Sequence, residues 1–379
     1  MRSIYTRDVV ALTAARLINF MTKLKKLFDS NALWLSMVIG ALGYQWLVPL
    51  KPLLPWLIFF MLFFTFCKIN PLDLRLRRWH WVVLSLQIVL SLATYYGLMA
   101  LTHNAILSQG MMLCFIMPTA TAAPIIAGKL GGSIQNLTSF TLLSNFATSL
   151  IVPAFFPLVY PAAEMTFVNA FLLLLSRISP LLLGPFFAAW LLRLGYNYYY
   201  RHKNRTVSKA SGLTAQRSYS DSDPTGEAGQ KEFVLPARWA QTPFYLWVAS
   251  IIVLSATVTQ TVITNYKLQI TNMIILIIGS FLACLFQFGV GKYIGYKLPA
   301  PSKGKDYQDV LINPAAAPKT MEGVSSITAG QAFGQKNTSL GVWMAQTYLD
   351  PLSSLGAAAY IIWQNLFNSV QLALAARKK

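Results

Sequence analysis

The chain contains ten apolar stretches that are long enough to cross a lipid bilayer, and these limit the fold more than any other feature. In hydrocarbon the backbone must satisfy its own hydrogen bonds, so stretches of about 20 apolar residues cross as helices. Only 11% of the 379 residues are charged, against about 25% in soluble domains. The sequence therefore predicts an all-α polytopic membrane protein. The ten predicted spans are 31–50, 52–68, 79–102, 106–129, 134–160, 167–194, 241–263, 269–296, 324–348 and 353–376.

The positive charge of the chain is concentrated between the spans. Of its 31 Lys and Arg residues, 27 lie in segments that a cytoplasmic N-terminus places inside, and only Lys51 and Lys267 lie outside. Arg177 and Lys336 lie within spans. This asymmetry follows the positive-inside rule, so both termini are predicted to be cytoplasmic and the net charge of +19 implies no nucleic-acid partner. Because we recognise no cleavable or targeting signal, we expect the inner (plasma) membrane of a bacterium.

A polar connector divides the spans into two groups of five. Residues 196–240 are rich in Ser, Gly and charge, which is typical of a flexible cytoplasmic linker. They separate a first unit at 29–195 from a second at 241–376, with a basic amphipathic lead-in at 1–28 and a tail at 377–379. A repeat with an odd number of spans enters the membrane with opposite polarity the second time. The division therefore predicts two inverted five-helix repeats.

The fourth span of each unit is interrupted. Pro118 and Pro124 break the first of them, and Gly334 and Lys336 lie in the middle of the second. A lysine at the bilayer centre costs roughly 3 kcal/mol, so it must face protein or water. Paired interruptions of this kind mark transporter binding sites, because non-helical backbone at this depth must line a cavity. We expect discontinuous helices four and nine to cross and to offer half-helix N-termini to an anion.

Other kinds of site have little support in the sequence. Cys67, Cys114 and Cys284 are scattered through the spans and the three His residues lie far apart, so we predict neither a disulfide framework, a metal site nor a cofactor. The spans hold no acid pair and no Ser-His arrangement, so an intramembrane enzyme is not expected. Nothing in the sequence indicates an oligomeric state.

Five segments, in this order, resemble one known family. Gln87 lies in LSLQIVLSL, Pro118–Asn145 holds the first interruption and the helix after it, Phe286–Tyr296 is FQFGVGKYIGY, Gly334–Asn337 is GQKN, and Leu355–Leu372 contains WQN. Together they resemble the bile acid:sodium symporter family, most closely its divergent branch related to the seventh human solute carrier. The resemblance implies a core domain of spans three to five and eight to ten, a panel domain of the other four, and secondary transport of an organic anion by alternating access, usually driven by two sodium ions.

The ligands of the first sodium site do not carry over from that family. Its Ser-Asn pair after the first interruption is here Ala123-Pro124, and the serine of the next helix is Leu137. Thr141 is kept, but the acid of the family signature aligns with Ala332, with Gln331 one residue earlier. The first sodium site is therefore predicted to be absent.

The second sodium site departs from the family at one position. Gln87 is kept, but the last glutamine of the signature is Lys336, between Gln335 and Asn337. We expect Lys336 to act as a built-in or titratable substitute for sodium, so that transport is proton-coupled or independent of ions. Three alternatives remain open: Lys336 snorkels to an interface as a structural charge, backbone carbonyls rebuild a conventional sodium symporter, or the scaffold is a membrane regulator that transports nothing.

Polar residues near the two interruptions are candidates for the substrate cavity. Ser and Thr on membrane helices often bond to their own backbone, and an arginine near a helix end often snorkels, so each has a structural alternative. Gln364 and Asn365 are also expected to fasten the last span to the core. The candidates are Thr119, Thr121, Ser144, Asn145, Asn365 and Arg177.

Overall fold

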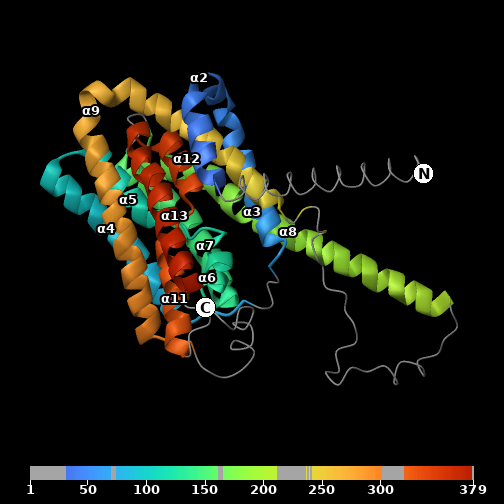
Figure 1. The fold of residues 1–379 in the computed structure, drawn as a ribbon. Helices are drawn as coiled ribbons and strands as arrows, with labels where there is room; N and C mark the ends of the chain where they lie inside the picture. The colour runs from blue at the N-terminus through green and yellow to red at the C-terminus, as the bar shows by residue number, and fades with distance from the viewer. Residues whose placement is uncertain are drawn as a thin grey trace, which may run out of the picture.

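The computed structural model describes residues 31–69, 74–160, 165–210, 241–300 and 320–377, together with Pro236 and Trp239. Across these residues every regular element is a helix, so the predicted all-α fold is confirmed (Figure 1). Their one β contact is an isolated bridge between Thr119 and Lys336. The predicted lead-in at 1–28 and the last two residues of the tail lie outside the described residues.

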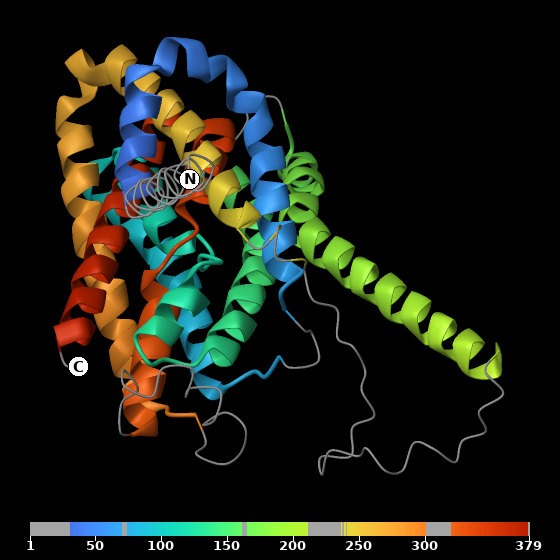
Figure 2. The ribbon, with the colours of Figure 1, turned by 45° about the vertical axis from the view of Figure 1, so that its right-hand side comes forward.

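The first helices form a hairpin, which Figure 2 shows in blue. Pro49 and Pro52 tighten its turn into a 3₁₀ helix, because proline has no N–H for an α-helical hydrogen bond. The hairpin packs against α9 (Thr242–Lys297). Its elements are the helix Asn31–Leu42, α2 (Tyr44–Leu47), η1 (Val48–Leu53) and α3 (Leu54–Phe66).

The predicted interruption of the span at 106–129 is observed as a helix break. Residues 117–122 leave the helix next to Pro118, and the chain re-enters a helix with Pro124 in its first turn. Asn104 caps the helix before the break, and Ser133 caps the long helix at 134–159; each accepts a hydrogen bond from a first-turn backbone N–H group. The elements of this region are α4 (Arg78–Thr102), α5 (Ala105–Ile116), α6 (Ala123–Lys129) and α7 (Ile134–Val159).

Helix α8 (Phe167–Ala210) is longer than the predicted span at 167–194. It runs on into the segment 196–240, so the first part of the predicted flexible linker is helical instead. Figures 1 and 2 show this helix projecting away from the bundle. The stretch after Leu194 contains, up to Ala210, no proline and no glycine other than Gly195, so it lacks the residues that break a helix most strongly.

Helix α9 joins two predicted spans, 241–263 and 269–296. Gln269 has φ −128° and ψ 18°, and this single non-helical residue kinks the helix where a loop was predicted. The second half of α9 descends beside α11 (Met321–Gly334), as Figure 1 shows.

The last predicted spans are also helical, and the ninth is broken as predicted. Residues Gln335, Lys336 and Asn337 leave the helix, and Asn337 caps the next one by accepting a hydrogen bond from the backbone N–H of Leu340 at 3.3 Å. The elements that follow α11 are α12 (Thr338–Tyr348), η5 (Pro351–Ser353) and α13 (Ser354–Arg377).

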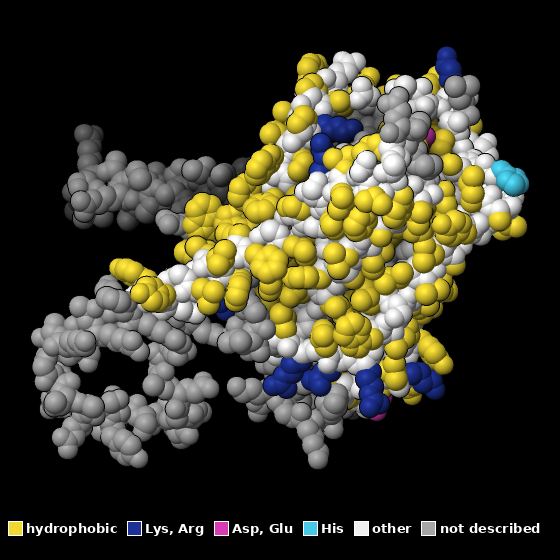
Figure 3. Space-filling view, turned by 180° about the vertical axis from the view of Figure 1, so that it is seen from behind, with side chains coloured by type: hydrophobic (Ala, Val, Ile, Leu, Met, Phe, Trp, Pro, Cys, Tyr) yellow, Lys and Arg dark blue, Asp and Glu magenta, His cyan; other side chains and the backbone are white. Residues whose placement is uncertain are grey.

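Six helical segments of the described chain are long and apolar enough to cross a membrane, so the protein is a membrane protein with transmembrane helices. Figure 3 shows hydrophobic side chains over the middle of one face and most of the Lys and Arg side chains along its lower edge. The broken spans do not count among the six because each half is short. The six are Tyr44–Phe66, Arg78–Thr102, Ile134–Val159, Phe167–Tyr199, Thr242–Lys267 and Gln269–Lys297.

Small residues allow α9 and α11 to pack at close range. A Cβ at Gly291 would collide with the backbone of Ala329, and one at Gly295 with the backbone of Ser325. Association of helices in lipid depends on close van der Waals packing rather than on the hydrophobic effect, so small residues at such contacts are stabilising. This contact fixes α11, and with it the break at 335–337, against the second half of α9.

Candidate functional site at the crossing of two helix breaks

The two helix breaks meet and satisfy each other's backbone. The backbone N–H of Ala120 donates to the Gln335 carbonyl at 2.9 Å, and that of Asn337 donates to the Pro118 carbonyl at 2.7 Å. These bonds flank the bridge between Thr119 and Lys336. Because buried backbone groups must be paired, the crossing allows two helices to unwind in the interior of the bundle. The predicted meeting of the two breaks is confirmed.

The central residue of each break donates a side-chain hydrogen bond to the C-terminal end of the helix that leads into the other break. Thr119 Oγ1 donates to the carbonyl of Ala332 at 2.6 Å, and Lys336 Nζ donates to the carbonyl of Phe115 at 3.1 Å. Each acceptor lies four residues before the opposite central residue. The last carbonyls of a helix lack partners within it and form the negative end of its dipole. Lys336 therefore lies where a cation is favoured.

Two glutamines satisfy the remaining carbonyls at the end of α5. Gln87 Nε2, from α4, donates to the carbonyls of Ile116 at 3.3 Å and Met117 at 3.2 Å. Gln287 Nε2, from α9, donates to the carbonyl of Cys114 at 3.0 Å. The end of α5 is thus a row of carbonyl oxygens whose donors come from two different helices, α4 and α9, and from the second break.

Lys336 is completely buried and has no carboxylate partner in the part of the chain that the structure describes. The only acidic residues in that part are Glu322, in the first turn of α11, and Asp350, which caps η5. The ammonium also lies 5.1 Å from the centre of the Phe333 ring. Its surroundings are therefore one carbonyl dipole and one aromatic face, in place of an opposite charge.

Helix α13 holds the second break in place. The side-chain Oε1 of Gln364 accepts from the backbone N–H of Lys336 at 2.8 Å, and its Nε2 donates to the Lys336 carbonyl at 3.2 Å. The hydroxyl of Tyr360 donates to the Gly334 carbonyl at 2.8 Å and accepts from Gln287 Nε2 at 3.1 Å. The predicted attachment of the last span by Gln364 is confirmed. Asn365, in contrast, is half-buried and donates to Ile361 on its own helix.

The other predicted ion-coupling residues divide into two groups. Gln335 and Asn337 lie in the break itself, and Gln335 Oε1 is buried without a hydrogen-bond partner. Gln331 turns toward α13, where its Nε2 donates to Asn368 Oδ1 at 3.0 Å. Thr141 donates to the Leu137 carbonyl on its own helix at 2.9 Å, so it is not oriented toward the crossing.

The positions that the sequence resemblance assigns to a first sodium site are occupied by buried apolar residues. Ala123 and Leu137 are fully buried in a hydrophobic cluster with Ala332 and Phe333. Pro124 is buried as well. The absence of a first sodium site stays a prediction.

The predicted cavity residues lie at different distances from the crossing. Ser144 Oγ accepts from the backbone N–H of Thr119 at 3.1 Å, so it supports the first break. Asn145 is buried and donates to the Thr141 carbonyl at 2.7 Å, while its Oδ1 has no partner. Thr121 is half-buried at the break, and Arg177 is exposed on α8.

Two residues at the crossing were not singled out from the sequence. Gln287 carries a signal of the same kind as Gln87, an amide inside an apolar stretch, but it was considered only as part of a motif. Tyr360 has no comparable signal, because a tyrosine in a span is ordinary and only its contacts with α9 and α11 reveal its position.

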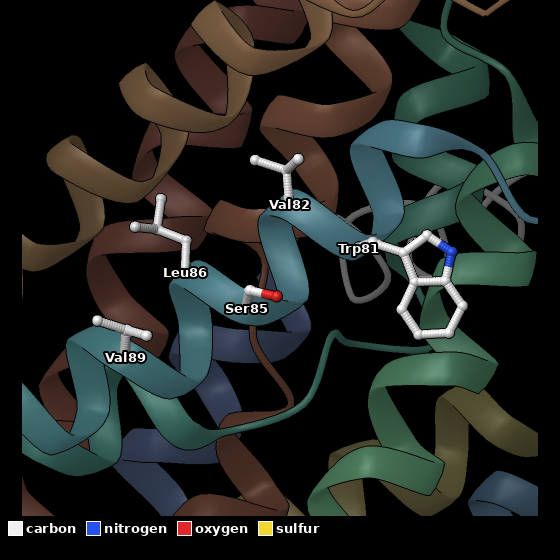
Figure 4. A pocket seen from close by; sticks show the side chains of 5 residues that line it. All are labelled: Trp81, Val82, Ser85, Leu86 and Val89. Atoms are coloured by element: carbon white, nitrogen blue, oxygen red, sulfur yellow. The ribbon is translucent and has the colours of Figure 1, made fainter.

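Two pockets lie away from the crossing. One, of about 110 Å³, is lined by Met37, Leu254, Val342 and Ile361, between the first hairpin, α9, α12 and α13. The other, of about 430 Å³, lies on the outer face of α4, where Figure 4 shows Trp81, Val82, Ser85, Leu86 and Val89 projecting from one helix. Both are mainly apolar. No protein-family model and no curated protein sequence matches the chain.

Proposed function

We propose that the protein is a secondary active transporter of the bile acid:sodium symporter type, which moves an organic anion by alternating access. In this proposal Lys336 replaces the coupling cation, so transport is proton-coupled or independent of ions. One observation carries the proposal: a buried ammonium, which has no carboxylate partner among the described residues, donates to the carbonyl row at the end of a broken helix, beside Gln87. Half-helix C-termini of this kind coordinate sodium or protons in transporters.

The reciprocal capping at the crossing supports the ten spans and the inverted repeats of the proposal. Thr119 and Lys336 occupy equivalent positions, because each donates to the carbonyl four residues before the other. The order of helices around them is also the same, with a break between two short helices followed by a longer helix, α7 or α13. Two repeats of the same helices, inserted into the membrane in opposite directions, would produce such a pair of reciprocal hydrogen bonds.

The charge distribution supports the proposed orientation, with both termini in the cytoplasm. Lys267 lies at the kink of α9 and Lys297 at its C-terminal end. The helical segment Gln269–Lys297 is long enough to span the membrane, so the two lysines lie at its opposite ends. Most Lys and Arg side chains of the face in Figure 3 gather at one edge. The side with more basic residues is the cytoplasmic one.

The substrate proposed for the cavity between the core and the panel is an amphipathic or small organic anion. The apolar pocket lined by Met37, Leu254 and Val342 touches both proposed domains and would accept an apolar part of such a molecule. Asn337 opens α12 next to the crossing, and the N-terminal end of that helix favours a negative charge.

A conventional sodium symporter is the second candidate, because buried amide oxygens at the crossing lack partners. Gln87 Oε1, Gln287 Oε1 and Gln335 Oε1 accept no hydrogen bond. Such groups require a donor or a cation, and sodium is bound by oxygen atoms of this kind. Sodium and the Lys336 ammonium would compete for the same part of the molecule.

The melting temperature of the purified chain distinguishes these two candidates. We would compare wild type, Lys336→Gln and the control Lys267→Gln, which removes an exposed lysine, in sodium and in potassium from about pH 6 to pH 9. A ligand that binds only the folded state raises the melting temperature by mass action. We expect wild type and the control to respond to pH but not to sodium, and Lys336→Gln to respond to sodium but not to pH.

Either of two results contradicts the proposed role of Lys336 as a substitute for the coupling cation. If sodium stabilises wild type, the second candidate is correct and carbonyl oxygens form a sodium site beside the lysine. If the pH response survives unchanged in Lys336→Gln, another group titrates and Lys336 is a structural charge.

A further inference from the structure

A second group of polar side chains lies between α9, α11 and α13, toward the C-terminal ends of α9 and α13. On α13, Gln364, Asn368 and Gln371 recur at a spacing that places them on one face of the helix. Gln364 is fully engaged with the backbone of Lys336. The next two residues along the same face, Asn368 and Gln371, each have an amide N–H group without a hydrogen-bond partner among the described residues.

The pair formed by Gln331 and Asn368 leaves one donor and one acceptor unused. Gln331 is 1% exposed and Asn368 is 3% exposed, and they share one hydrogen bond of 3.0 Å. Gln331 Oε1 and Asn368 Nδ2 have no partner. If both side-chain amides are rotated by 180°, Asn368 becomes the donor and Gln331 the acceptor of their shared hydrogen bond. One amide donor and one amide acceptor of the pair still remain unused. A buried pair of this kind is stabilised when a further donor and a further acceptor reach it, and one group that both accepts and donates can supply both.

A positive charge lies at the same junction. The stem of Lys292 passes directly over Gly330, and a Cβ at Gly330 would collide with it. The Nζ atom of Lys292 lies 5.5 Å from the centre of the Phe367 ring. Gly330 and Phe367 immediately precede Gln331 and Asn368, so Lys292 lies against the residue next to each member of the amide pair, on α11 and on α13. No described carboxylate is bonded to this lysine, and the segment 301–319 lies outside the described residues.

A third donor comes from the next turn of α13. Gln371 Nε2 is buried and has no hydrogen-bond partner among the residues that the structure describes. It lies four residues after Phe367 and three after Asn368, which places it beside both on the helix surface. The junction thus contains an ammonium, two unused amide donors and one unused amide acceptor, contributed by three helices.

We propose that this junction binds a phosphate group. A phosphate in its hydrogen-bearing form accepts hydrogen bonds from Lys292, Asn368 and Gln371 and donates one to Gln331 Oε1, which satisfies every unused group. Its source is either a soluble phosphate or the headgroup of a phosphatidic acid in the cytoplasmic leaflet. The inference does not depend on the proposed transport function, because it uses no residue of the crossing.

The test is a titration of the full-length chain in detergent with inorganic phosphate at constant ionic strength, followed by the melting temperature. We expect a saturable rise in wild type and in Lys297→Gln, which removes an exposed lysine one turn further along α9. Lys292→Gln should raise the apparent Kd about tenfold or more, because it removes a charged hydrogen-bond donor. Lys292→Arg should restore binding.

Sulfate provides a second measurement on the same samples. Sulfate has the same shape but carries no proton at neutral pH, so it cannot donate to Gln331 and should bind more weakly to wild type. Gln331→Leu should bind phosphate and sulfate equally. Salt effects on stability that are not specific to a site would be the same in every variant.

Short-chain phosphatidic acid added to the micelles separates the two sources. If it shifts the melting temperature and inorganic phosphate does not, the site holds a lipid headgroup; the reverse result indicates a soluble ligand. If neither compound shifts the melting temperature, or if Lys292→Gln responds as wild type does, the proposal is wrong.

Discussion

At the scale of single residues, the main physical question is how Lys336 can be buried with no carboxylate beside it in the described part of the chain. Removing an ammonium from water is costly unless polar groups replace the solvent. Here the replacement is the Phe115 carbonyl at the negative end of α5 and the face of the Phe333 ring. Two other donors, Gln87 and Gln287, take the neighbouring carbonyls and leave this one to the lysine.

The backbone N–H of Lys336 is paired by one side chain, that of Gln364. Gln364→Leu would leave this N–H unpaired, at a cost of roughly 1–3 kcal/mol, and would remove one of the two hydrogen bonds to the Lys336 carbonyl, which also accepts from the backbone N–H of Thr338. We therefore expect a melting temperature several degrees lower in detergent. Asn365→Leu is the matched control: it changes the next residue, whose amide bonds only to its own helix, and should shift the melting temperature little. Equal shifts for both variants would contradict this account.

At the scale of elements, each helix break is stabilised by a partner that is distant in the sequence. Pro118 explains why α5 ends where it does, because proline cannot donate the next helical hydrogen bond. The free backbone groups are then paired across the crossing, at Ala120 with Gln335 and at Asn337 with Pro118. Neither break could be accommodated in the interior without the other.

The close contact between α9 and α11 makes a prediction about two glycines on the same helix. Gly295→Leu would place a side chain against the backbone of Ser325, and overpacking typically costs about 1–3 kcal/mol. Gly289→Leu is the control, because a Cβ at Gly289 has no neighbour within 4 Å. We expect Gly295→Leu to lower the melting temperature and the yield of folded protein, and Gly289→Leu to leave both unchanged or slightly raised. A well-folded Gly295→Leu protein would show that the helices are further apart than described.

At the scale of the whole molecule, the arrangement separates a polar interior from a lipid-facing exterior. The outer face of α4 presents Trp81 and Val89, while its inner face presents Gln87 to the crossing. The same helix thus contributes both to the apolar surface and to the carbonyl row. Because hydrocarbon cannot solvate polar groups, a polar centre requires such a surrounding layer.

The proposed orientation can be measured by chemical labelling. The native residues Cys67, Cys114 and Cys284 are buried, so new cysteines at Lys267 and Lys297 are the reactive ones. In intact bacterial cells, a maleimide that cannot cross the membrane should label Lys267→Cys, at the kink of α9, and not Lys297→Cys, at its end. Permeabilised cells should label both. Labelling of only Lys297→Cys in intact cells would reverse the topology.

The sequence by itself determined which segments are helical and where two of them break. These features depend on local properties: apolar composition over a membrane thickness, proline without an N–H, and a lysine that lipid would reject. Local composition was less informative at Gln269, where one kinked residue replaces the predicted loop, and after Leu194, where the helix continues into the predicted linker.

The tertiary structure decided which groups meet at the crossing. Gln87, Gln287 and Lys336 approach one row of carbonyls from three elements, while Thr141 bonds to its own helix and Arg177 lies on the exterior. Which side of a helix faces the interior depends on how helices distant in the sequence pack together, and a single span does not contain that information. Lys336 is prominent in the sequence because a charge is rare there, but the Phe115 carbonyl that accepts its hydrogen bond is a backbone group, which no residue type identifies.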